Sequence, residues 1–206
     1  MGILSSSASV VRYQVKGEIK DPLLDTITQG LNKHRISEID NNPQDKASGW
    51  TSFKNPYLAD FSGSSFSYDP YIVFSLRIDK KSIPSKIIQK QYVTEMTRRL
   101  ANGNRSHISR HEKKEIKDHI ISSLGMRIPA TPNIYDVIWL PEKATLWFFS
   151  TLKSANEEVE SLFLKSFSLS LIRLFPYTQA VCMEGFSDRE MDMLNHLSPT
   201  NFAAVG

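Results

Sequence analysis

The positively charged residues of this 206-residue chain are concentrated in one segment. Between Arg77 and Arg127 there are 13 Lys and Arg residues against 5 Asp and Glu residues, a net charge of +8. The rest of the chain carries 12 basic and 17 acidic residues, a net charge of −5. A basic segment inside an acidic remainder is typical of a surface that binds a polyanion, and the whole-chain charge of +3 conceals it.

Within this segment, four cations fall on one stripe of a predicted helix, all within roughly 100° of one another. They are Arg110, Lys113, Lys114 and Lys117. Their mutual repulsion does not favour the helix, whereas the release of counterions from a phosphate backbone would offset that cost. The alternative is a solvated face on which Glu112, Glu115 and Asp118 pair with these cations, and the sequence leaves both interpretations open. The residues predicted to bind DNA are Lys80, Lys81, Lys86, Lys90, Arg98, Arg99, Arg105, Arg110, Lys113, Lys114, Lys117 and Arg127.

Two rival hypotheses come from other classes of protein. A metal-dependent nuclease would use side chains from the same segment, namely His107, His111, His119, Glu112, Glu115 and Asp118. The three histidines do not share a helix face at metal-ligand spacing, and the chain has no HExxH, paired DxD, glycine-rich phosphate loop or GxSxG motif. We therefore predict no catalytic residue, no metal site and no cofactor. The third hypothesis is an adaptor whose basic segment binds an acidic protein.

The periodicity of apolar residues predicts the elements that must position these cations. We expect strands at 10–17, 71–79, 134–139, 145–150 and 178–183, and helices at 22–35, 85–100, 110–125, about 156–174 and 188–196. Asp21, Ser85, Ser109 and Ser187 are the predicted N-caps, and the last two form capping boxes with Glu112 and Glu190. Residues 51–69 are expected to hold a short strand and loops. Strands and helices do not alternate strictly, which favours the α+β class.

The predicted architecture is an antiparallel or mixed sheet with packed helices and a protruding two-helix tip. Residues 1–84 and 134–206 would form the centre, with a frayed tail from Ser198, and residues 85–133 the basic helical excursion. We expect Trp50, Trp139 and Trp147 in the core, with the alternative that an exposed Trp50 stacks on a base.

Composition points to a cytoplasmic protein, as three observations indicate. The chain has a single cysteine, Cys182, which fits a reducing compartment. No apolar run approaches the roughly 18 to 20 residues that a membrane span requires. The start of the chain also lacks the features of a signal peptide.

The chain resembles the recombination-associated RdgC family in the order and spacing of several motifs, over most of its length. The motifs are the run 112–124, Arg127, the hairpin at 136–139, the helix start at 154–158, Gly49-Trp50 and the helix start at 85–88. The resemblance is closest to short RdgC-like proteins with this opening and this Gly-Trp pair.

The resemblance implies a protein that binds DNA without sequence preference, lacks catalytic residues, dimerises around duplex DNA and restrains the loading of a recombinase. The resemblance also implies a nucleoid-associated protein, with single-stranded DNA as a further partner to consider. The implied dimer contact is a tip comprising Gly125, Met126, Ile128 and Pro129. Longer family members continue beyond the position of Gly206 with a segment that contributes a second ring contact, and they carry a Phe where this chain has Pro129. Both departures concern ring closure rather than the basic segment.

Overall fold

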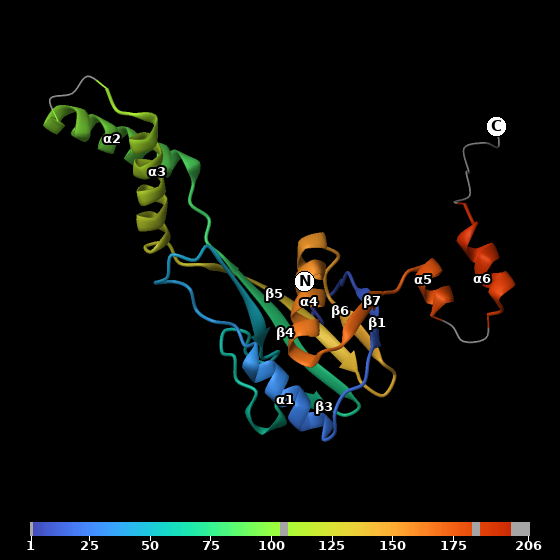
Figure 1. Cartoon of the computed structure of the whole chain (residues 1–206). Coiled ribbons are helices and arrows are strands. Elements are labelled where there is room, and N and C mark those ends of the chain that lie inside the picture. The colour runs from blue at the N-terminus through green and yellow to red at the C-terminus, as the bar shows by residue number, and fades with distance from the viewer. Residues whose placement is uncertain (1, 104–106, 183–185, 199–206) are drawn as a thin grey trace.

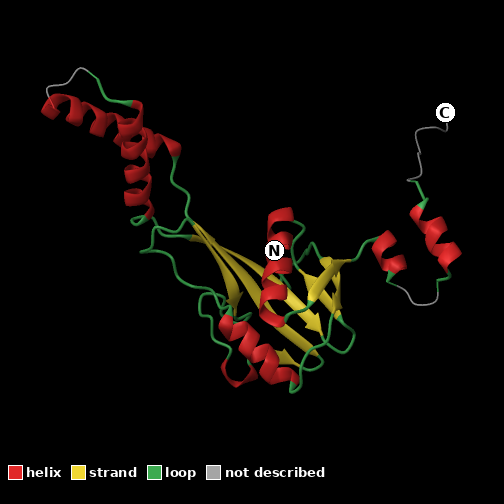
Figure 2. Ribbon diagram, viewed as in Figure 1, coloured by secondary structure: helices red, strands yellow, loops and turns green. Residues whose placement is uncertain are grey.

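In the computed structural model, residues 2–103, 107–182 and 186–198 are described. The chain has an α+β fold built on one seven-stranded, curled antiparallel sheet, as the sequence predicted (Figure 2). The strands are β1 (Val11–Lys16), β2 (Lys46–Thr51), β3 (Ser67–Tyr68), β4 (Tyr71–Lys80), β5 (Thr131–Leu140), β6 (Thr145–Phe148) and β7 (Ser170–Arg173). Their order in the sheet is β2-β4-β5-β6-β1-β7, with β3 paired to β4.

Six α-helices lie within the described residues. They are α1 (Leu23–Lys33), α2 (Ser85–Gly103), α3 (Arg110–Gly125), α4 (Lys153–Phe167), α5 (Pro176–Val181) and α6 (Asp188–Asn195). α1 and α4 cover one face of the sheet, whereas α2 and α3 project from its end (Figure 1). Both projecting helices are inserted between β4 and β5, which pair antiparallel from Ile72↔Trp139 to Lys80↔Thr131. The helical excursion is therefore a long insertion in a β-hairpin.

The main core is aromatic and lies between the sheet and these two covering helices. Trp50 packs edge-on against Phe74 with 5.0 Å between ring centroids, and Trp139 packs against Phe163 at 4.9 Å. Trp50 is fully buried, and its indole N–H donates to the hydroxyl of Ser166 on α4 (2.7 Å). Base stacking by Trp50 is therefore excluded. Trp147 is 37% exposed on the opposite face of the sheet, so its assignment to the core was wrong.

The Gly49-Trp50 pair marks a crossing of two backbone segments. The chain leaving α1 bridges β2 in parallel at Arg35↔Trp50, and the N–H of Ile36 donates to the carbonyl of Trp50 (2.9 Å). A Cβ atom at Gly49 would lie 2.4 Å from the backbone nitrogen of Ile36. Any larger residue would push this segment off the sheet, so the glycine is required by packing.

Several predicted boundaries were wrong for non-local reasons. β2 was not among the expected strands, and β7 was expected to be part of a helix that instead ends at Phe167, where Ser168 adopts φ 58°. The expected strand at 178–183 coincides with α5, which begins at Pro176. Asp21 does not cap α1, whose N-cap is Pro22 without a side-chain hydrogen bond. The predicted frayed tail falls almost entirely outside the described residues.

Candidate nucleic-acid interface

The helical tip, which we define as α2, α3 and the chain between them, has its own small core. Ile108, Ile116, Ile120 and Leu124 are buried there. The apolar residues that α2 contributes are only partly buried: Ile88, Tyr92, Met96 and Leu100. This cluster is separate from the aromatic core under the sheet. The tip is thus a thin two-helix layer whose other surfaces face solvent.

A capping box fixes the start of α3, as the sequence predicted. The N–H of Glu112 donates to the hydroxyl of Ser109 (3.2 Å), and the Glu112 carboxylate accepts from the N–H of Ser109 (3.0 Å). Two of the otherwise unpaired donors at the helix start are satisfied in this way. The cap therefore fixes the residue at which α3 begins.

The four residues of the stripe are all exposed along α3. The buried positions Ile116, Ile120 and Leu124 lie beside the stripe and do not include any of its members. Among the described residues, none of the three stripe lysines forms an ion pair, and the carboxylate of Glu115 faces His111 instead (3.6 Å). The lysine charges on this face are therefore not neutralised by the described part of the helix.

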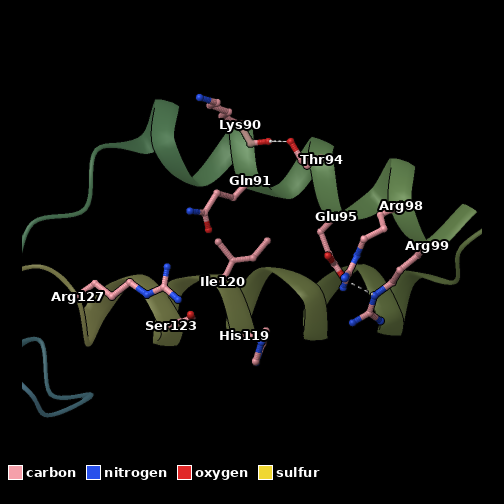
Figure 3. Close-up of a pocket in the computed structure, with 10 residues that line it drawn as sticks. All are labelled: Lys90, Gln91, Thr94, Glu95, Arg98, Arg99, His119, Ile120, Ser123 and Arg127. Atoms are coloured by element: carbon pink, nitrogen blue, oxygen red, sulfur yellow. Dashed lines mark hydrogen bonds and ion pairs between the residues drawn. The ribbon is translucent and has the colours of Figure 1, made fainter. Parts of the chain in front are cut away.

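A second group of cations lies on another side of the tip. A groove of about 520 Å³ between α2 and α3 is lined by ten residues. They are Lys90, Gln91, Thr94, Glu95, Arg98, Arg99, His119, Ile120, Ser123 and Arg127 (Figure 3). None of the stripe residues lines it, and Lys117 lines a separate hollow with Ser85, Ile88, Gln89 and Tyr92. Eight of the predicted DNA-binding residues thus fall into two groups, four in the stripe and four in this groove, which we call the arginine groove.

One carboxylate organises the outer end of the arginine groove. Glu95 accepts from Arg98 (2.9 Å) and from Arg99 (3.0 Å), one helical turn away on α2. These two hydrogen bonds hold the pKa of Glu95 below its ordinary value, and the hydrogen bond that Arg98 donates to Glu95 raises the pKa of Arg98. Two guanidinium groups thus share one carboxylate at this end of the groove.

The remaining predicted cations have different settings. Lys80 and Lys86 are exposed. Lys81 is half-buried, and its ammonium donates to the carbonyls of Asp40 (3.0 Å), Asn42 (2.7 Å) and Gly125 (2.6 Å). Its three hydrogens are thus used to tie the end of α3 to the loop that precedes β2. Arg105 lies outside the described residues.

Arg77, which opens the basic segment, belongs to the fold rather than to a surface. It is 6% exposed and pairs with the fully buried Asp79 (2.7 Å) and with Glu38 (3.1 Å). Burial opposes its charge, but the hydrogen bonds and charge of Asp79 outweigh it and leave the pKa of Arg77 raised. A charge count along the sequence cannot separate such a residue from its surface neighbours.

The four residues expected at a dimer tip lie at the opposite end of the helical excursion, next to the sheet. Gly125, Met126, Ile128 and Pro129 follow α3 where the chain returns to the sheet, at the base of the excursion (Figure 1). The base is held by Lys81, which bonds the Gly125 carbonyl, and by Asp40, which accepts from the N–H of Ala130 (2.8 Å). The second helix of an insertion in a hairpin must lead back to the sheet. The outer end of this insertion is therefore where α2 ends and α3 begins.

The histidines and carboxylates of the rival nuclease do not converge. Among the described residues, no group of three or more His, Cys, Asp or Glu side chains is arranged to hold a metal ion. His111 and Glu115 approach each other as an i, i+4 pair on an exposed face of α3. Within the same part of the chain, no helix is long and apolar enough to cross a membrane.

An α+β protein with a basic two-helix insertion at the end of an antiparallel sheet is the class that these features define. A family model described as "Putative exonuclease, RdgC" matches residues 8–182. The chain therefore belongs to the RdgC family. A search of curated proteins finds no match.

Proposed function

We propose that the chain is a non-enzymatic protein that binds duplex DNA without sequence preference and acts in DNA recombination. The observation that carries this proposal is the stripe on α3, whose lysines are exposed and lie beside the buried row of the helix. A lysine ammonium is a point charge that suits phosphate oxygens, and three such charges beside an arginine follow a backbone rather than a base edge.

The energetics of the stripe support the same ligand. Clustered cations repel one another on an isolated helix by a few tenths of a kcal/mol per pair. Each phosphate contact releases condensed counterions from DNA, which offsets that repulsion once the complex forms. The stripe also has no Asn or Gln, the side chains that read adenine in the major groove.

Family membership supports the role in recombination and the dimer. The partners that we propose are duplex DNA, a second copy of the chain and a recombinase whose loading is restrained. The residues we propose for the dimer contact remain Gly125, Met126, Ile128 and Pro129, now at the base of the excursion. Met126 is 48% exposed there, which leaves an apolar side chain available to a partner.

The description of the family as an exonuclease makes cleavage the alternative to exclude by experiment. Linear duplex DNA is incubated with the protein in magnesium and in EDTA, then resolved on a native gel and on a denaturing gel. The proposal expects a shifted band of intact DNA in both conditions. Shortened DNA in magnesium alone would identify the enzyme instead, and no shift in either condition would favour an adaptor for an acidic protein.

A further inference from the structure

The arginine groove differs in chemistry from the stripe, although both are cationic. The stripe consists of three lysines and one arginine on a convex helix surface. The groove holds Arg98 and Arg99 at its outer end and Arg127 at its inner end. In Figure 3 the guanidinium of Arg127 lies between the two helices, and Arg98 and Arg99 extend from α2 toward α3, whereas the Lys90 ammonium points away. The charges that face the groove are therefore carried by arginines.

The middle of the groove is uncharged. Ile120 of α3 lies there, only 6% exposed, with the Gln91 amide and the hydroxyls of Thr94 and Ser123 around it. The amide of Gln91 projects toward α3 (Figure 3). A phosphate backbone alone would contact only the cations and would leave these apolar, amide and hydroxyl groups without a partner. It offers a planar, polar-edged group a surface to rest on and hydrogen bonds at its rim.

The volume and length of the arginine groove fit one nucleotide and the phosphates that flank it. The volume of about 520 Å³ lies in the range of roughly 300–1,000 Å³ that small-molecule sites occupy. Between Gln91 and Arg98 α2 rises by about 10 Å, so the charged end of the groove is separated from its uncharged middle by more than one base thickness. A duplex cannot enter a space of this size, because its bases are stacked and paired inside a much wider cylinder.

We propose that the arginine groove binds single-stranded nucleic acid, with an unpaired base against Ile120 and Gln91 and flanking phosphates at Arg127 and at Arg98 and Arg99. Guanidinium planes stack on bases and bind phosphates in bidentate fashion, which lysine cannot do. The inference rests on the proposed function and deepens it. Duplex contacts the stripe, and an unpaired strand contacts the other side of the same two helices.

The experiment compares two ligands and two matched variants of the full chain. The ligands are a fluorescent oligothymidylate of about ten nucleotides, which cannot pair with itself, and a fluorescent duplex. The groove variant is Arg98→Ala with Arg127→Ala, and the stripe variant is Lys113→Ala with Lys114→Ala. Each variant loses two exposed charges from the tip. Binding is measured by anisotropy as a function of salt, and circular dichroism checks that each variant is folded.

The groove variant is expected to lose about 25-fold in affinity for the oligothymidylate at about 0.1 M salt, because two single-strand phosphate contacts remove roughly 1.4 from the salt slope. Its affinity for duplex should change little. Gln91→Ala should weaken oligothymidylate binding several-fold and leave the salt slope unchanged, since it removes hydrogen bonds and no charge. A surface that acts by charge alone would not respond to this last change.

The outcomes separate this inference from the proposed function. Equal losses for both ligands in the groove variant, or none for either, would overturn the groove assignment, as would a wild-type chain that does not bind the oligothymidylate. Displacement of the oligothymidylate by polyglutamate at equal charge concentration would also overturn it. A stripe variant that keeps its duplex affinity would refute the stripe as the duplex site and leave the groove result standing.

Discussion

Reversal of three charges on α3 tests whether the stripe is the path of duplex DNA. Lys113, Lys114 and Lys117 are each replaced by Glu. All three are exposed, form no ion pair among the described residues and border the packed row of α3 without belonging to it. Surface substitutions of this kind change stability by about 0.5 kcal/mol or less each, so the variant is expected to remain folded.

The magnitude of the loss follows from counterion release. Each contact with duplex phosphate releases about 0.9 counterions, so three lost contacts remove roughly 2.7 from the slope of log K against log salt. At about 0.1 M salt this corresponds to a loss of about 500-fold per protomer. The three new carboxylates repel the backbone and add to this loss. The effect should shrink as salt rises, because the lost term is itself proportional to log salt.

The assay is anisotropy of a fluorescent duplex over a range of salt concentrations, with two controls. The charge-matched control replaces Lys16, Lys20 and Lys143 by Glu, three exposed lysines of the sheet body. It changes the net charge of the chain equally and should cost far less affinity. The second control, Ser109→Ala, removes the hydroxyl that accepts from the Glu112 N–H. It should lower stability by about 1 kcal/mol and spare binding.

Two results would refute the reasoning. Near-native affinity of the α3 variant at moderate salt would mean that duplex does not cross this helix. An equal loss in the sheet-body control would mean that net charge, rather than the position of the lysines, drives binding.

Four further predictions can be checked independently. The wild-type salt slope for duplex should be roughly −5, with little change between unrelated sequences, and a slope near −1 would contradict a multi-phosphate contact. Sedimentation at tens of micromolar should give a homodimer, and a monomer with and without DNA would exclude one. Lys81→Met should lower the free energy of unfolding by about 1–3 kcal/mol in denaturant titrations, because three carbonyls lose their donor. Burial raises the pKa of Glu158, but hydrogen bonds from Lys46 and Ser48 outweigh this effect and leave the pKa lowered. The wild-type protein should therefore be more stable than Glu158→Gln at neutral pH, and this difference in the free energy of unfolding should disappear as the pH falls below about 4.

The elements with local signals could be predicted from the sequence. The Ser109 and Ser187 capping boxes are read from residues three apart, and both are present in the structure. β4 is almost continuously apolar, and eight of its ten residues are buried. These signals depend only on residues close together in the chain, so they can be recognised without knowledge of the fold.

The elements that depend on distant partners could not be predicted. β2 is polar and small at its start and is a strand because it pairs with β4 from Lys46↔Lys80 to Thr51↔Ser75. β7 continues an apolar run, but the end of α4 at Ser168 carries no glycine to signal it. Ser85 was expected to cap α2, yet it is the first helical residue, and the Pro84 carbonyl accepts from the Ile88 N–H (3.3 Å).

The sequence predicted which cations belong to the candidate site, but it did not predict how they are grouped in space. The sequence identified the cations of α2 and α3, and the stripe geometry within α3 follows from helix periodicity alone. How α2 lies against α3 depends on the packing of Ile88 and Tyr92 against Ile116 and Ile120. That packing decides which cations share a groove, so the division between stripe and groove is visible only in three dimensions.

The separate core of the helical tip has a consequence for the lifetime of its hydrogen bonds. The four buried aliphatic residues of the tip stabilise far less structure than the aromatic core beneath the sheet. Opening of the tip leaves the β4–β5 ladder intact, because the chain enters and leaves the tip at neighbouring ends of those two strands. The amides of α2 and α3 should therefore exchange with solvent deuterium by sub-global opening, well before those of β4. A bound nucleic acid, which contacts only the closed form, would slow that exchange in proportion to its occupancy.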